Sequence, residues 1–100
     1  MDDLYTDSAK RVMAIAQEQA NYFRHQAIGT EHLLLALTIE DKGVAGQVLK
    51  QAMVTPGDVR REIERLAGYG NLLRQSPSNY LPYSPKAKAV LDETRKQAFL

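Results

Sequence analysis

Cysteine is absent from the 100-residue sequence, which excludes a disulfide framework, a thiolate nucleophile and a cysteine-based metal site. An excess of either charge is also lacking, because 13 lysine and arginine residues balance 12 aspartate and glutamate residues. General nucleic-acid-binding proteins usually carry a clear basic excess. We therefore expect a single neutral domain that binds no nucleic acid, and the lack of cysteine suits a reducing, cytoplasmic compartment.

Long apolar runs are missing as well. The longest, from Leu33 to Leu37, is far shorter than the roughly 20 residues that span a bilayer. The N-terminus begins Met1-Asp2-Asp3 and lacks the apolar segment of a secretory signal. No segment alternates apolar and polar residues for long enough to indicate a strand. We therefore expect no membrane span and an all-α fold.

Helical periodicity covers most of the first half of the chain. Apolar side chains recur at three- and four-residue spacing from Thr6 to about Phe23, with Thr6 as N-cap. Residues 31–39 are apolar almost all round, which predicts a helix at the centre of the core, capped by Thr30. A third predicted helix carries an apolar stripe made of Val44, Ala45, Val48, Leu49 and Ala52.

Two more helices follow. The fourth has Thr55 as N-cap and a proline at its first position, and it ends at Gly68 or Gly70. Its predicted inward-facing residues are Val59, Ile63, Leu66 and Ala67. Residues 70–83 show no helical pattern and are rich in loop residues, which indicates a linker. The fifth helix starts after Ser84 as N-cap and runs to the end of the sequence.

The beginning of the fifth helix repeats the beginning of the first at a constant offset, which the pair Tyr5 and Tyr83 sets at 83 − 5 = 78 residues. The other identical pairs are Ala9/Ala87, Lys10/Lys88, Val12/Val90, Gln19/Gln97 and Ala20/Ala98. A period this long indicates a duplicated four-helix unit. We expect residues 1–69 to form the first repeat, and residues 84–100 to form the first helix of a second repeat that is incomplete here.

These features resemble the Clp N-terminal repeat. The most specific element is the run Gly29-Thr30-Glu31-His32-Leu33-Leu34-Leu35, and a second repeat begins at Tyr83-Ser84-Pro85-Lys86. The sequence is similar to that of ClpC-type AAA+ unfoldases, the ATPase partners of the ClpP protease. The resemblance covers nearly the whole chain and implies an N-domain built from two four-helix repeats.

The resemblance also implies a function. Such a domain is non-catalytic, belongs to a hexameric unfoldase, and receives protein substrates and adaptors that resemble MecA for delivery to ClpP. Some members are also expected to bind phosphoarginine, a degradation mark. ATP and Mg²⁺ are expected in the longer parent protein, since this sequence lacks G-x-x-x-x-G-K-[ST]. A stand-alone helical adaptor or peptide-binding domain without an ATPase stays open as an alternative.

Basic residues stand at both duplicated helix starts, where the helix macrodipole disfavours positive charge. Lys10 follows Thr6 by four positions, and Lys88 follows Ser84 by four. A hydroxyl, a helix N-terminus and a lysine together suit a phosphate group. The family resemblance assigns Glu31 to the guanidinium of phosphoarginine, which a carboxylate can bind through two parallel hydrogen bonds.

Structural roles remain open for all five candidate ligand-binding residues. Thr6 and Ser84 can act as ordinary N-caps, and a capping hydroxyl can also contact a ligand. Glu31 complements the dipole at the start of its helix. Lys10 and Lys88 can be solvated surface charges. No convergent set of histidine and carboxylate residues is visible, so we expect no catalytic residues.

Two further expectations concern packing. His25 and His32 are predicted to lie on different elements with no cysteine nearby, which argues against a zinc site, and His32 is expected to be a partly buried packing residue. The apolar stripe of the fifth helix should pack against the first repeat, against a second copy of the chain, or against neighbouring molecules.

Overall fold

The computed structural model describes residues 6–70 and 81–97, with side chains as far as Glu93. Within these residues the chain forms five helices: α1 (Asp7–Tyr22), α2 (Thr30–Ile39), α3 (Val44–Gln51), α4 (Pro56–Leu66) and α5 (Pro85–Gln97). The described part contains no strand, and a single parallel bridge joins Ile28 to Tyr83. The all-α prediction is confirmed. None of the described helices is long and apolar enough to cross a membrane.

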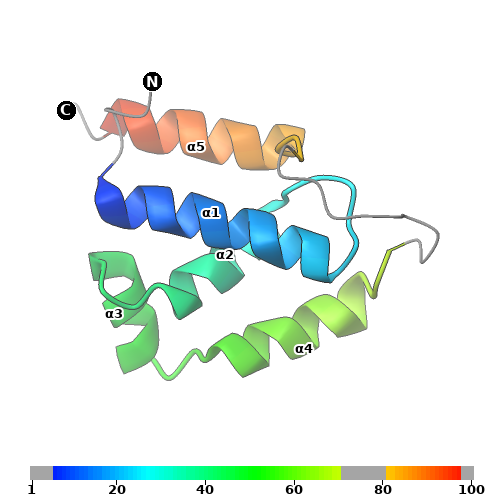
Figure 1. The fold of residues 1–100 in the computed structure, drawn as a ribbon. Coiled ribbons are helices and arrows are strands. Elements are labelled where there is room, and N and C mark those ends of the chain that lie inside the picture. Colours follow the sequence, from blue (N-terminus) through cyan, green and yellow to red (C-terminus); the bar gives the residue numbers. More distant parts are fainter. Residues whose placement is uncertain (1–5, 71–80, 98–100) are drawn as a thin grey trace.

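Helix α2 lies at the centre of the molecule and packs against each of the other four helices (Figure 1). Its side chains explain this position, because Leu33, Leu35 and Ala36 are buried on different sides of the same short helix. A helix that is apolar almost all round loses least to water when other helices surround it. The predicted central role of this segment is therefore confirmed.

The main core cluster joins α1, α2 and α5. Val12, Ala16 and Ala20 are buried on one face of α1, as the three- and four-residue spacing predicts. Ala87 of α5 is buried in the same cluster, and Leu91 packs against it. Of the alternatives for the fifth helix, the described residues show packing against the first repeat.

Parts of two predicted apolar faces are exposed to solvent instead of being buried. On α3, Val44 is 82% exposed and Val48 is 58% exposed, because this helix meets α2 through Gly46. A Cβ atom at Gly46 would lie only 2.8 Å from the carbonyl oxygen of Leu37. On α4, Val59 and Ile63 are buried as predicted, but Leu66 is 72% exposed and Ala67 is exposed as well, so the prediction that these two residues face inward is wrong.

The predicted helix caps are confirmed with one exception. The side-chain oxygens of Thr6, Thr55 and Ser84 each accept a hydrogen bond at 3.1 Å from the amide three residues later. The N-cap of α2 is Gly29, not Thr30, which is the first helical residue. Gly29 is extended, and its own amide donates to a side chain of α2, so the helix begins one residue earlier than predicted.

Glycine ends α4 and lets the following turn approach α1. Gly68 has a φ of +65°, the left-handed conformation in which glycine commonly ends a helix. The amide of Gly70 donates to the carbonyl of Phe23 at 2.7 Å, and a Cβ atom at Gly70 would overlap the carbonyl oxygen of Arg24. Of the predicted 70–83 linker, residues 71–80 lie outside the described residues, and the two-repeat division stays a prediction.

Candidate functional site

A surface cavity of about 470 Å³ lies where the N-terminal ends of α2 and α5 meet. Its lining residues come from the loop before α2, the first turn of α2, the end of α4 and the start of α5: His25, Ala27, Gly29, Thr30, Glu31, His32, Ala67, Ser84 and Lys86. The cavity therefore brings a carboxylate, a hydroxyl and an ammonium group to the starts of two helices.

Backbone hydrogen bonds hold these two helix starts together. The amide of Ile28 donates to the carbonyl of Pro82 at 2.8 Å, and the amide of Ser84 donates to the carbonyl of Ile28 at 2.9 Å. Ile28 itself is buried in the main core cluster. The segment before α5 is thus fixed against the segment before α2, more than fifty residues away in sequence.

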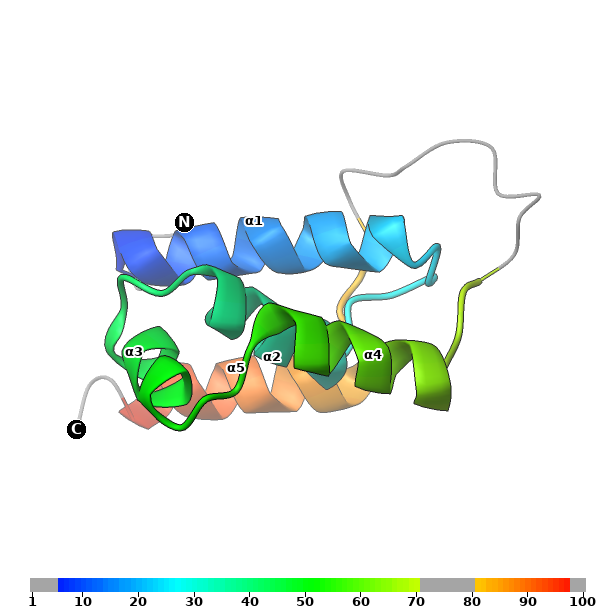
Figure 2. The same cartoon turned by 90° about the horizontal axis from the view of Figure 1, so that it is seen from below.

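The structure brings together two of the five predicted site residues. Glu31 and Ser84 line the same cavity. Lys88 lies on the exposed surface of α5 and does not line it. Thr6 and Lys10 stand at the N-terminal end of α1, and α1 and α5 run in opposite directions, so the two duplicated helix starts lie at opposite ends of the molecule (Figures 1 and 2).

Contacts near the start of α1 confirm this separation. The side chain of Arg11 donates to the carboxylate of Glu40, which follows the C-terminal end of α2. Glu31 lies in the first turn of α2, at the other end of that helix. Thr6 and Lys10 therefore lie toward the C-terminal end of α2, whereas Ser84 lies near its N-terminal end.

Lys86 is a cavity residue that the matched lysine pair did not single out. It stands in the first turn of α5 and lines the cavity together with Glu31 and Ser84. Lys86 has no counterpart in the repeat, since the equivalent position in α1 is Ser8. The sequence could have indicated Lys86 as a candidate, because it directly follows Pro85 and therefore lies in the first turn of the predicted helix.

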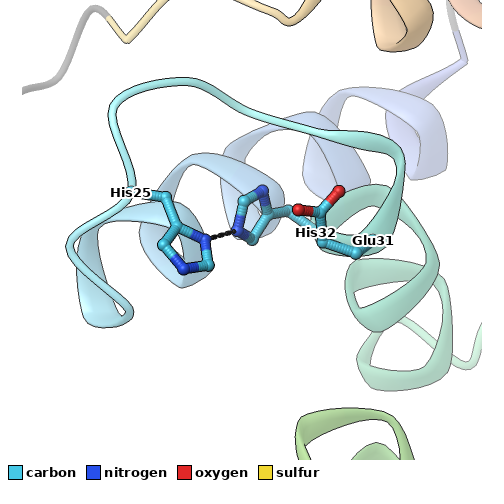
Figure 3. A group of neighbouring side chains, drawn as sticks. All are labelled: His25, Glu31 and His32. Carbon is cyan, nitrogen blue, oxygen red and sulfur yellow. Dashed lines mark hydrogen bonds between the residues drawn. The ribbon is translucent and has the colours of Figure 1, made fainter. Parts of the chain in front are cut away.

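The two histidines touch each other inside this region (Figure 3). Nδ1 of His25 lies 2.8 Å from Nε2 of His32. Nδ1 of His32 accepts from the amide of Gly29 at 2.8 Å, and Nε2 of His25 lies 2.8 Å from the carbonyl oxygen of Gly68. The expectation that the histidines lie on different elements is correct, but the fold brings those elements into contact. His32 is 1% exposed, so it is more deeply buried than expected.

The neighbours of the ring nitrogens fix where the protons are. A backbone amide can only donate, so Nδ1 of His32 is unprotonated and the proton of the neutral ring is on Nε2. A carbonyl oxygen can only accept, so Nε2 of His25 carries the proton and its Nδ1 accepts from His32. Both rings are neutral in this arrangement, and all four ring nitrogens are hydrogen-bonded.

A metal ion does not fit this arrangement. His25, Glu31 and His32 offer ligand atoms that lie within 4.8 Å of one another, and two imidazoles with a carboxylate form a possible zinc ligand set. However, a histidine that binds metal through Nε2 carries its proton on Nδ1, and that proton would face the amide hydrogen of Gly29. The cluster is therefore a hydrogen-bond chain.

Burial sets the protonation behaviour of the inner histidine. Desolvation lowers the pKa of His32 below its ordinary value, and the neighbouring His25 lowers it further, while the charge of Glu31 acts in the opposite direction. The lowered pKa favours the neutral form of His32 at neutral pH. This agrees with the two acceptor–donor assignments that the hydrogen bonds require.

A second cavity, of about 350 Å³, lies beside the first between α2 and α4. Its walls are mainly apolar and include Leu34 and Leu66, which are both exposed. Glu31 and Ala67 line both cavities. The end of α4 is therefore a wall shared by a polar cavity and an apolar one.

Comparison with known proteins gives one consistent result. Residues 4–99 match the family described as Clp repeat (R) N-terminal domain. The chain is 44% identical, over 95 residues, to the "ATP-dependent Clp protease ATP-binding subunit ClpC" of the Staphylococcus aureus strains USA300, NCTC 8325 and bovine RF122. The aligned region covers 91% of this chain but only 11% of each of these relatives.

Proposed function

Because the chain belongs to the family of Clp repeat N-terminal domains, we propose that it is the non-catalytic docking domain of a ClpC-type unfoldase. In this role it receives protein substrates and MecA-like adaptors in the cytoplasm and passes them to the ATPase ring and a ClpP-type protease. ATP and Mg²⁺ belong to the longer parent protein in this proposal. The phosphate-binding loop sequence G-x-x-x-x-G-K-[ST] does not occur in these 100 residues.

The observation that supports a ligand-binding role is the meeting of Glu31, Ser84 and Lys86 in one cavity. A phosphoarginine side chain has a guanidinium group and a phosphate group close together. The Glu31 carboxylate can accept two parallel hydrogen bonds from the guanidinium. The ammonium group of Lys86 and the positive end of the α5 dipole attract the phosphate.

Ser84 can cap the helix and contact a ligand at the same time. Its oxygen accepts from the amide of Ala87, and its backbone carbonyl accepts from the amide of Lys88. The hydroxyl proton of Ser84 is not used by the cap and remains a donor for a phosphate oxygen. Pro85 has no amide hydrogen, so Lys86 is the first residue of α5 that can offer both an amide and a positive charge.

Thr6 and Lys10 require a different partner. They form the equivalent helix start in the first repeat, but α2 presents its C-terminal end to them. In the two-repeat arrangement, the counterpart of Glu31 in a second repeat would complete a site with Thr6 and Lys10, just as Glu31 of the first repeat meets Ser84.

Calorimetric titration with free phosphoarginine tests the proposed ligand. We expect the wild-type chain and a Glu18→Ala control to bind equally, because Glu18 is an exposed carboxylate on α1. Glu31→Ala should bind at least about tenfold more weakly, because a charge-assisted hydrogen bond contributes about 1.5–3 kcal/mol. Equal affinity of Glu31→Ala and the wild type would contradict the assignment of Glu31.

A further inference from the structure

A continuous chain of hydrogen bonds crosses three segments beside the cavity. It runs from the amide of Gly29 through the rings of His32 and His25 to the carbonyl of Gly68. Gly29 precedes α2, His25 lies in the loop after α1, and Gly68 follows α4. Two side chains thus connect parts of the fold that are up to 43 residues apart in sequence.

We propose that His25 and His32, called here the histidine clasp, form a proton-sensitive link that holds the C-terminal end of α4 against the loop between α1 and α2. The clasp is closed when both rings are neutral and opens when a proton is added. The proposal concerns the fold of the chain itself, so it does not depend on the identity of any ligand.

The sensitivity to protons follows from the geometry of each bond. A neutral imidazole both donates and accepts, whereas an imidazolium only donates. Adding a proton to Nδ1 of His25 would place it against the proton on Nε2 of His32. Adding a proton to Nδ1 of His32 would place it against the amide hydrogen of Gly29. Either event replaces a hydrogen bond by two opposed donors, so no charged form preserves the whole chain.

The elements around the clasp carry charged and titratable groups. Glu31 of α2 and Lys86 of α5 line the same cavity as the two histidines, Arg24 directly precedes His25, and Glu64 and Tyr69 lie near the end of α4. Glu31 favours a proton on His32, but burial of the ring opposes it more strongly, and the net effect lowers the pKa of His32. Tyr69 and Glu64 are hydrogen-bonded to each other at 2.7 Å. Burial of the His32 ring therefore favours the neutral, closed form of the clasp at neutral pH.

Opening the clasp would affect both cavities. Ala67 lines the polar cavity and the apolar one, and it is adjacent to Gly68, whose carbonyl the clasp holds. On the other side of Gly68, the amide of Gly70 is bonded to Phe23, and the ring of Phe23 stacks on that of His25. When His25 leaves Gly68, the turn that carries Ala67 and Gly70 loses one of its side-chain anchors, and the ring contact of Tyr69 with Phe23 remains.

Nuclear magnetic resonance of the 100-residue chain tests the proposal without a ligand. Imidazole ¹⁵N shifts at about pH 7.5 should show the Nε2-protonated tautomer for both histidines. Between about pH 7.5 and about pH 5, the exchange protection of the Gly70 amide should fall at least about tenfold, as expected for the loss of one or two hydrogen bonds. The amide of Glu40, which is bonded to Ala36 at the far end of α2, should keep its protection.

Two variants separate protonation from packing. In His25→Gln, the side-chain amide can accept from His32 and donate to Gly68 but cannot be charged, so the Gly70 amide should stay protected at both pH values. Gln26→Ala, an exposed neighbour, should behave like the wild type. A wild-type Gly70 amide that is equally protected at both pH values, an Nδ1-protonated tautomer in either ring, or a full pH response in His25→Gln would each overturn the proposal.

Discussion

The carbonyl oxygen of Ile28 accepts a hydrogen bond from the amide of Ser84 at 2.9 Å. This bond joins the residue before the α2 cap to the N-cap of α5, and it is the reason that two distant helix starts border one cavity. A cavity that both helix dipoles make positive, with Glu31 on its wall, offers complementary charge to a ligand with both signs. The first two predictions below depend on this contact.

Substitutions of Ser84 should separate its role as helix cap from its role in binding phosphoarginine. Ser84→Asn and Ser84→Asp both retain a good N-cap, and Ser84→Ala should lower the free energy of unfolding by about 1 kcal/mol. The negative charge of Ser84→Asp would face the phosphate of a bound phosphoarginine, so this variant should bind it more weakly than Ser84→Asn does. Urea unfolding and calorimetry measure the two effects. Equal binding by the Asn and Asp variants would show that no phosphate lies near this residue.

Substitutions of Lys86 and Lys88 should change the affinity for phosphoarginine by different amounts, although both residues belong to the first turns of α5. Only Lys86 lines the cavity. In calorimetric titrations with phosphoarginine, Lys86→Ala should reduce the affinity roughly tenfold, the effect of removing one hydrogen bond to a charged group. Lys88→Ala should reduce it little, because an exposed charge outside the cavity is screened by solvent and salt. A larger effect at Lys88 would restore the assignment made from the repeat.

Substitution by alanine should have opposite effects at two glycines, Gly46 at the contact between α2 and α3 and Gly57 in α4. At Gly46 a Cβ atom would lie on the carbonyl of Glu40 and 2.8 Å from that of Leu37. Gly46→Ala should therefore lower the free energy of unfolding by about 1–3 kcal/mol, as overpacking does. At Gly57 of α4 the nearest atom would be 3.6 Å away, on the flexible Arg61 side chain. Gly57→Ala should raise stability by about 0.4–1 kcal/mol. Urea unfolding of both variants checks the difference, and equal changes would contradict it.

Protonation of Glu40 should lower the free energy of unfolding of the chain in acid. The hydrogen bond from Arg11 lowers the pKa of this carboxyl below its ordinary value, and the bond from the amide of Lys42 lowers it further. A lowered pKa in the folded state means that the unfolded chain takes up the proton first. The stabilisation is therefore complete above the ordinary glutamate pKa, near 4.5, and is lost as the pH falls through the folded-state pKa.

Arg11→Met tests this prediction. The variant should be less stable than the wild type at neutral pH, and it should lose less stability in acid, because its Glu40 has a smaller difference between folded and unfolded pKa values. Arg61→Met, which breaks an exposed ion pair with Asp58, should change stability little at any pH. Unfolding midpoints in urea, measured from about pH 7 to about pH 3, give the comparison. Parallel curves for Arg11→Met and the wild type would rule out this role of Glu40.

Local physical chemistry made the helices predictable. The spacing of apolar residues defines α1 and the central position of α2, and the hydroxyls of Thr6 and Ser84 mark where two helices begin. These signals act within one or two helical turns, so the sequence alone is enough to find them. The assignment of the α2 cap to Thr30 failed because the ring of His32, a residue rarely considered for this purpose, bonds to the amide of Gly29.

Tertiary structure decided which of these elements meet. The repeat matched Lys10 with Lys88 in sequence, but α1 and α5 run in opposite directions, so the two helix starts lie far apart (Figure 1). The cavity is lined by Lys86, together with Glu31, and not by Lys88. Similarly, the sequence placed His25 and His32 on separate elements, and only the packing of those elements made their rings touch. The amino-acid sequence by itself determined an all-α chain, its helix starts and its family. The cavity beside Glu31 and the contact between His25 and His32 depend on long-range contacts, because hydrogen-bond partners far apart in sequence leave no periodic signal within either segment.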